Sequence, residues 1–167
     1  KHQTLFKLLS RVFFVSLGMA DILTLAYRLA NTDVVKTLVR ILNKKTTQKF
    51  ITDLNTKVQL FDYGEDSEGV QLSAIGGLYA ESTIRISRPK KKNRSHINLK
   101  DTGAFYKTFD ITVKQNADFT ITANTNKGDQ DLQDRWGDNI VGLQTENEVL
   151  VMDYLRNEFY KMMYKGL

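Results

Sequence analysis

The spacing of apolar residues changes along this chain, and the changes divide it into helical and strand-forming parts. Residues 1–30 are apolar nearly all the way round a helix, a pattern typical of a helix that is buried on several sides. A polar break follows, in which Thr32 or Asp33 can cap a second helix. Apolar residues then recur at helical spacing up to Phe61. We therefore expect two helices, or one long kinked helix, that end near Phe61.

The first of these segments has two interpretations. Asp21 and Arg28 interrupt it, so its longest uncharged run, residues 12–20, is shorter than the roughly 20 residues of a membrane-spanning helix. A domain of this size offers little core to surround such a helix. Its apolar faces are therefore buried either against neighbouring subunits or at the centre of the domain's own core. We interpret residues 1–48 as an N-terminal helical arm. Its candidate assembly contacts are Leu5, Phe6, Leu9, Phe13 and Leu17.

A strand pattern follows in the second half of the chain. Residues 109–113 and 119–123 alternate apolar and polar side chains, and a short polar segment joins the two runs. This alternation predicts a β-hairpin over residues 109–123 with one apolar face. Gly103 permits a tight turn just before the hairpin. The candidate residues of the turn and the hairpin core are Thr102, Gly103, Phe105, Phe109, Ile111, Val113, Phe119 and Ile121.

The end of the chain predicts a long helix over residues 146–164. Thr145 and Glu148 have the spacing of a capping box. The apolar residues that follow recur every three or four positions: Val149, Met152, Leu155, Phe159 and Met162 or Met163. We expect this stripe to pack on the hairpin. The predicted fold is therefore α+β: an N-terminal apolar helical arm, then a small antiparallel sheet packed against a C-terminal helix.

Composition narrows the chemistry that the chain can perform. The 167 residues include no Cys, one Pro and two His. The lack of Cys excludes a disulfide scaffold, a Cys-ligated zinc site, an iron–sulfur cluster and a thiol nucleophile. No nucleophile–base pair or cluster of metal ligands is evident in the sequence, so we expect no enzyme activity, no metal and no cofactor.

The net charge of +5 conceals a gradient along the chain. Residues 1–61 carry +7, residues 62–100 carry +2 and residues 101–167 carry −4. Such a chain can attract copies of itself head to tail, or lay its basic part on an anionic surface. Two solvated faces of opposite sign are the alternative interpretation.

The densest basic run surrounds the sole proline, Pro89, which disfavours a regular element, so we expect an exposed basic loop over residues 85–98. Its cations are candidate contacts to another subunit or to nucleic-acid phosphates. The alternative interpretation is a solvated loop that binds no partner. The cations are Arg85, Arg88, Lys90, Lys91, Lys92 and Arg94.

A series of short pieces adds a family resemblance. The pieces are Gln59-Leu60-Phe61, Asp66-Ser67-Glu68-Gly69, Tyr79 with Ser82-Thr83-Ile84, the basic run, Leu99-Lys100-Asp101-Thr102-Gly103-Ala104-Phe105, Asn139-Ile140-Val141-Gly142-Leu143 and Thr145-Glu146-Asn147. Their order and spacing resemble the tailed-phage virion-morphogenesis or tail-completion family. That family has a D-x-x-G loop, a Y/W…S-x-x-T segment, a Lys/Arg stretch and an L-x-x-T-G-x-L/F turn that leads into a hairpin. The resemblance covers about two thirds of the chain, from near Phe50 to the end, and the N-terminal apolar helix departs from it.

The resemblance implies a non-enzymatic structural protein of the virion neck, with residues 49–167 as an α+β core similar to tail-completion proteins. Members of the family form rings, commonly hexameric, that join the tail tube to the head connector. The implied partners are copies of the same chain, the connector or portal-side protein and the tail-tube protein, with transient contact to genomic DNA and no membrane. The implied location is the virion neck or tail, and the host cytoplasm during assembly.

Two questions stay open at this point. Tail completion, tail termination and head closure all use small α+β rings, so the resemblance does not choose among these three roles. The residues themselves also allow a different function, in which the chain is a nucleic-acid-binding protein that uses the basic loop 85–94.

Overall fold

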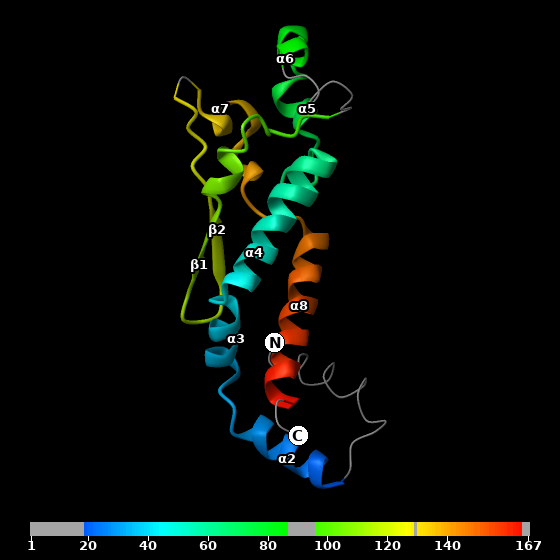
Figure 1. The fold of residues 1–167 in the computed structure, drawn as a ribbon, viewed down its shortest axis with the longest axis vertical. Coiled ribbons are helices and arrows are strands. Elements are labelled where there is room, and N and C mark those ends of the chain that lie inside the picture. Colours follow the sequence, from blue (N-terminus) through cyan, green and yellow to red (C-terminus); the bar gives the residue numbers. More distant parts are fainter. Residues whose placement is uncertain (1–18, 87–95, 129, 165–167) are drawn as a thin grey trace.

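The computed structural model describes residues 19–86, 96–128 and 130–164, which form an elongated stack of helices with a small sheet on one side (Figure 1). The helices of the first half are α2 (Met19–Ala30), α3 (Val34–Leu42), α4 (Lys45–Asp53), the π-helix η1 (Leu54–Tyr63), α5 (Leu72–Gly76) and α6 (Glu81–Ile86). The second half contains η2 (Phe105–Thr108), β1 (Asp110–Val113), β2 (Phe119–Thr122), α7 (Leu132–Trp136), η3 (Asp138–Ile140) and α8 (Thr145–Tyr164).

Capping interactions set the start of α3 and the end of η1 after the polar break. Asp33 is the N-cap of α3, because its Oδ1 accepts a hydrogen bond from the backbone N–H of Lys36 at 3.0 Å. α4 runs directly into η1, whose turns are wider than those of an α-helix. η1 ends at Tyr63, since Gly64 takes a left-handed conformation with φ 69° and donates its N–H to the carbonyl oxygen of Gln59. The prediction of helices that end near Phe61 is confirmed.

β1 and β2 form the antiparallel pair that the alternation predicted. Ile111 pairs with Ile121, and Val113 pairs with Phe119. Ile111 is buried and the other three side chains are partly buried against the same core. Helices together with a small two-stranded antiparallel sheet agree with the predicted α+β class at this coarse level.

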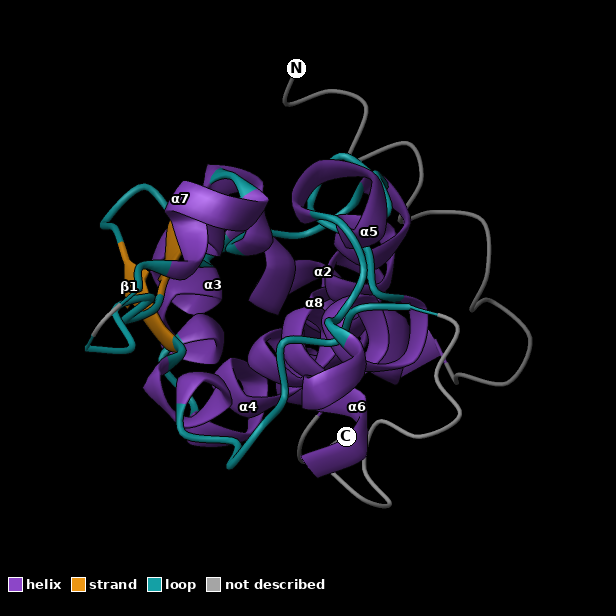
Figure 2. Ribbon diagram, turned by 90° about the horizontal axis from the view of Figure 1, so that it is seen from above, coloured by secondary structure: helices purple, strands orange, loops and turns teal. Residues whose placement is uncertain are grey.

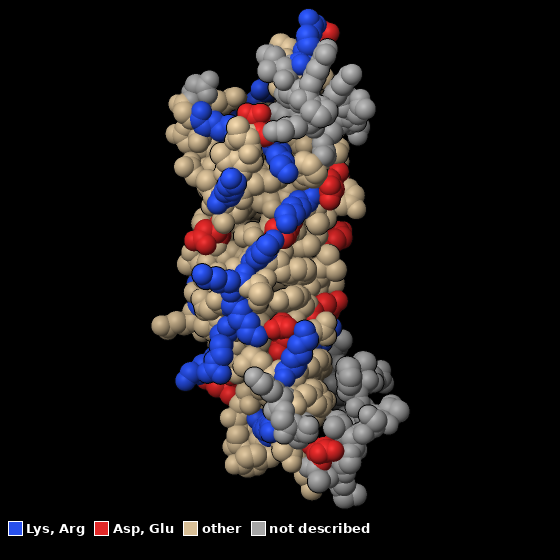
Figure 3. All heavy atoms as spheres, viewed as in Figure 1, with Lys and Arg blue, Asp and Glu red and all other residues tan. Residues whose placement is uncertain are grey.

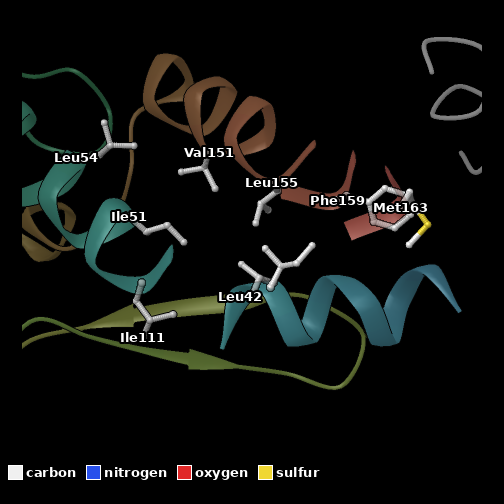
Figure 4. Packing of buried hydrophobic residues seen from close by; sticks show 9 residues of the cluster. Leu42, Ile51, Leu54, Ile111, Val151, Leu155, Phe159 and Met163 are labelled. Carbon is white, nitrogen blue, oxygen red and sulfur yellow. The ribbon is translucent and has the colours of Figure 1, made fainter. Parts of the chain in front are cut away.

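The first of two core clusters joins the hairpin to the long helices (Figure 4). It contains Ile41, Leu42, Ile51, Leu54, Ile111, Val151, Leu155, Phe159 and Met163. α4 packs against β1, whereas the main helix contacts of α8 are with α3 and α2. The expectation that the C-terminal helix packs on the hairpin itself therefore needs a correction: α3 and α4 lie between them, as Figure 4 shows. Ile41 and Leu42, which fall in the range expected to form an arm, are part of this core.

α8 has nearly the predicted bounds but a different buried face. Its buried residues are spaced by four throughout: Asn147, Val151, Leu155, Phe159 and Met163. Val149 and Met152, which we expected in the core, are 55% and 51% exposed. In this orientation the polar Asn147 forms a buried hydrogen bond with Gln59, and the predicted stripe faces partly outward.

The second core cluster lies at the other end of the molecule, around η1, α5 and α7. It contains Leu60, Leu72, Ile97, Leu99, Phe105, Leu132, Trp136 and Ile140. The Tyr79 hydroxyl holds this end together, since it accepts hydrogen bonds from the backbone N–H groups of Asn98 and Leu99 and donates one to Asn98 Oδ1. Seen from above, the hairpin lies at one edge next to α3, and α8 lies toward the other side (Figure 2).

Candidate functional site

A hollow of about 690 Å³ opens between the end of η1, the loop of residues 64–71 and the first turns of α8. We call it the acidic groove and define it by six of its lining residues. Its apolar wall consists of Val58, Tyr63 and Leu150, and its acidic rim consists of Glu65, Glu68 and Glu146.

A buried amide network fixes the two helical walls of the groove. Gln59 of η1 is fully buried, and its Nε2 donates to the carbonyl oxygen of Gly142 at 3.0 Å. Gln59 Oε1 accepts from the backbone N–H of Gln144 at 3.0 Å and from Nδ2 of Asn147 at 3.3 Å. Asn55, one turn earlier, accepts from the backbone N–H of Gly142 at 3.0 Å. These bonds set the position and rotation of α8, because buried polar groups require their partners.

The loop that forms the rim is also held in one conformation. The Asp66 side chain is buried, and its Oδ1 accepts the backbone N–H groups of Glu68 and Val70, each at 2.9 Å. Gln144 Nε2 donates to Glu65 Oε2 at 2.9 Å and to the carbonyl oxygen of Asp66 at 3.0 Å. Both walls are therefore ordered before any partner arrives, which lowers the entropic cost of binding.

The three rim carboxylates differ in their environment. Glu65 is half-buried and is engaged by Gln71 and Gln144, at 2.8 and 2.9 Å. Glu68 and Glu146 are exposed, and neither forms an ion pair with a described residue. Two free negative charges beside an apolar wall are suited to a basic and apolar partner surface.

An outward-facing apolar surface adjoins the groove. We call Val149, Leu150 and Met152 the outer face of α8; their side chains are 55%, 48% and 51% exposed. Tyr63 on the opposite wall is 59% exposed. Leu150 and Tyr63 line the hollow, and exposed apolar side chains beside a hollow are typical of an interaction surface.

The sequence does contain a pattern that indicates this surface, although the predicted apolar stripe of the last helix draws attention away from it. Residues 149–152 are four consecutive apolar residues, and a helix packed on one side cannot turn all four of them toward its core. Which of them face outward depends on Gln59, 88 residues before Asn147. That tertiary contact has no local signature in the sequence.

The structure brings together several pieces of the sequence that carry the family resemblance. Residues 67–69 and 145–147 line the acidic groove, and Gln59 binds Gly142 and Asn147 beside it. The backbone N–H of Ser67 donates to the carbonyl oxygen of Asn139 at 2.8 Å, which joins two of these pieces directly. Tyr79 and the 99–105 piece meet in the second core cluster instead.

The predicted turn residues form a turn, and the predicted hairpin residues pack in or against the two core clusters. Thr102 Oγ1 accepts from the backbone N–H of Ala104 at 3.2 Å, and Gly103 has φ +82°, which favours glycine. Phe105 is buried and packs edge to face on Phe109, with 5.1 Å between ring centroids. Ile111, Val113, Phe119 and Ile121 belong to the first cluster or pack against it.

The predicted basic and arm contacts fall mostly outside the described residues. Arg85 lies in the last turn of α6, is exposed, and pairs with Glu81 at 3.2 Å. Arg88, Lys90, Lys91, Lys92 and Arg94 lie outside the described ranges. The arm residues Leu5, Phe6, Leu9, Phe13 and Leu17 lie outside them as well.

Within residues 19–86, 96–128 and 130–164 there is no group of three or more His, Cys, Asp or Glu side chains placed to hold a metal ion. In the same ranges no helix has both the length and the apolar character needed to cross a bilayer. Comparison of the chain with known protein families, with curated proteins and with solved structures gave no significant match.

Proposed function

We propose that this chain is a structural subunit that assembles head to tail into a ring in the neck of a tailed-phage virion, where it joins or completes the tail at the head connector. The observation that carries the proposal is the outer face of α8 next to the acidic groove, because a polar solvated helix would not expose Val149, Leu150 and Met152, of which Leu150 lines the hollow. The phage assignment rests on the family resemblance of the sequence.

The groove is the receiving surface of the contact between copies. Its walls are ordered by Gln59 and Asp66, so a neighbour meets a preformed shape. Its apolar wall offers surface to bury, and its free carboxylates at Glu68 and Glu146 favour a basic neighbour. The last third of the chain, which contains α8, carries −4, whereas residues 1–61 carry +7. The partner with this chemistry is the N-terminal part of a second copy.

The donating surface is the α2 end of the neighbouring copy. Leu23 and Tyr27 of α2 are 66% and 72% exposed, which makes them the most exposed large apolar side chains of α2. α2 lies at one end of the elongated molecule, and the groove lies toward the other end (Figure 1). The two surfaces are different, so the contact is heterologous. It closes into a ring when its rotation divides a full turn.

A charge placed in the groove tests this contact. We expect Leu150→Glu to abolish assembly, because the carboxylate meets Glu68 and Glu146 and the apolar contact is lost. If each contact between copies loses about 3 kcal/mol of association free energy, its affinity falls more than 100-fold. The measurement is the mass of the full-length chain by size-exclusion chromatography with light scattering.

The matched control is Asn157→Glu, which makes the same change in charge at another exposed position of α8. Far-UV circular dichroism must show the same helix content for both variants and the original chain. An original chain that stays monomeric at micromolar concentration contradicts the proposal, as does a Leu150→Glu variant that assembles like the control. In virions, antibody labelling should place the chain at the head–tail junction, and label elsewhere contradicts the phage-neck assignment.

A further inference from the structure

We infer that a second surface, separate from the acidic groove, binds duplex nucleic acid through its phosphate backbones, independently of base sequence. The surface is a stripe of cations along α3, α4 and η1, and it is visible as a diagonal blue band across one face of the molecule (Figure 3). We call it the basic stripe and define it as Lys36, Arg40, Lys45, Lys49 and Lys57.

The basic stripe follows the helical repeat. Lys36 and Arg40 are four residues apart on α3, and Lys45 and Lys49 are four residues apart on α4. Lys57 continues the row on η1. Four residues of an α-helix advance about 6 Å along its axis, so the exposed cations form a regular row on one side of the helices. All five side chains are exposed.

The basic stripe keeps a net positive charge, because its cations outnumber the carboxylates that pair with them. Asp53 pairs with two lysines at once, Lys49 at 2.5 Å and Lys57 at 2.9 Å. Burial acts to raise the pKa of Asp53, but hydrogen bonds from these lysines outweigh it and lower that pKa below its usual value. Lys36, Arg40 and Lys45 form no ion pair with a described residue. Among the described residues, Asp53 is therefore the carboxylate with which cations of the stripe form ion pairs.

A second carboxylate nearby repeats this arrangement. Glu158 of α8 accepts Lys44 at 2.8 Å and Lys161 at 2.9 Å, so one negative charge is again shared by two lysines. An isolated solvated face would be expected to pair cations and anions more evenly. The excess of cations at both carboxylates costs self-repulsion that a polyanion would relieve.

The side chains beside the stripe favour phosphate over protein or membrane. Thr46, Gln48 and Thr52 of α4 lie at least partly exposed between its cations, and such groups hydrogen-bond phosphate oxygens. Lysine is depleted at protein–protein interfaces, which need apolar or aromatic anchors. A membrane-surface helix likewise needs an apolar face beside its cations. Among the exposed large apolar residues, those on the helices of the stripe are Val34 and Val35 at the start of α3, 39% and 40% exposed, and Tyr63 at the end of η1, which do not make an apolar face along all three helices.

The composition of the stripe also indicates the mode of binding. Four of its five residues are lysines, which act on phosphate as point charges, whereas base reading relies on bidentate Arg, Asn or Gln. A duplex presents phosphates at high and regular density, about one charge per 1.7 Å of axis. We therefore expect binding to duplexes of any sequence.

The test measures binding of the full-length chain to a fluorescently labelled 30-base-pair duplex of arbitrary sequence by anisotropy between 50 and 200 mM salt. Five phosphate contacts predict a slope of about −4.5 for log affinity against log salt. The variant Lys36→Gln/Arg40→Gln/Lys45→Gln removes the three unpaired cations. It should reduce that slope to about −2 and the affinity at 0.1 M salt on the order of 100-fold.

The control removes the same charge from outside the three helices. Lys100→Gln/Lys107→Gln/Lys127→Gln replaces three exposed lysines and should leave slope and affinity nearly unchanged. The inference is overturned if the stripe variant and the control behave alike, if only substitutions in the basic loop 85–94 weaken binding, or if the original chain binds polyglutamate or anionic vesicles as tightly as DNA. Because these cations also belong to the +7 of residues 1–61, light scattering must show the same mass for the stripe variant and the original chain, so that lost DNA binding is not a loss of assembly.

Discussion

The buried amide of Gln59 is the contact on which the rotation of α8 and the shape of the groove depend most directly. We predict that Gln59→Leu, which keeps the approximate volume but removes the amide, strongly destabilises the chain. The substitution leaves three groups without their partner: the partly buried Gly142 carbonyl oxygen and Gln144 backbone N–H, and the buried Nδ2 of Asn147. Each unsatisfied buried group costs about 1–3 kcal/mol.

The total loss follows from those three groups. Local relaxation and water entry recover part of the cost, so we expect the free energy of unfolding to fall by about 3–5 kcal/mol. That is a large part of the roughly 5–15 kcal/mol that a domain possesses, so the variant is close to the limit of folding. Gln48→Leu is the matched control, because Gln48 lies half-exposed on the adjoining α4 and makes no side-chain hydrogen bond to a described residue. Its effect should lie within about 0.5 kcal/mol.

The assay is urea unfolding of both variants and the original chain, followed by circular dichroism at one protein concentration and in one oligomeric state. Amide hydrogen exchange supplies a local readout, since the N–H of Gln144 loses its acceptor only in the Gln59 variant. A loss below about 1 kcal/mol, or equal losses for Gln59→Leu and Gln48→Leu, would refute the reasoning that this network fixes α8.

Two further predictions concern other parts of the described chain. Hydrogen bonds from Lys44 and then Lys161 lower the pKa of Glu158 from its ordinary 4.5, so its contribution to stability is present above that value and is lost as pH falls through the lower folded-state pKa. Urea unfolding should therefore show that Glu158→Gln is less stable than the original chain at pH 7, and that the difference shrinks as pH falls below 4.5; a difference that stays the same from pH 7 into acid contradicts the assignment. Gly64→Ala should lower the free energy of unfolding by about 2–4 kcal/mol, because Gly64 has φ +69° and a Cβ would lie 2.5 Å from the carbonyl oxygen of Ile97. A thermal midpoint unchanged by this substitution would show that the close approach is absent.

Local patterns in the sequence were sufficient for several elements. The alternation around Ile111 and Ile121 predicted the hairpin, and the structure pairs these two residues in register. Asp33 was one of two candidate caps and is the N-cap of α3. The bounds of the last helix differ from the prediction by one residue at its start. In each case the determining interactions lie within a few residues along the chain, so a short window contains them.

The remaining features depend on contacts between distant residues. The outward rotation of Val149 and Met152 depends on the bond between Gln59 and Asn147, and local apolar spacing gives no information about it. The placement of α3 and α4 between hairpin and α8 is likewise a matter of tertiary packing. The basic stripe was visible only as part of the +7 charge of residues 1–61, because its cations are separated in sequence and meet on one face only once the helices form.

The mass of the assembled full-length chain tests the central proposal most directly. Native mass spectrometry should find one closed oligomer, and the family resemblance predicts about six times the 19.2 kDa chain mass. The Leu150→Glu variant should give the single-chain mass under the same conditions, while Asn157→Glu retains the oligomer. A single-chain mass for the original protein at every concentration, or an open series of masses without a closed species, would contradict assembly into a ring.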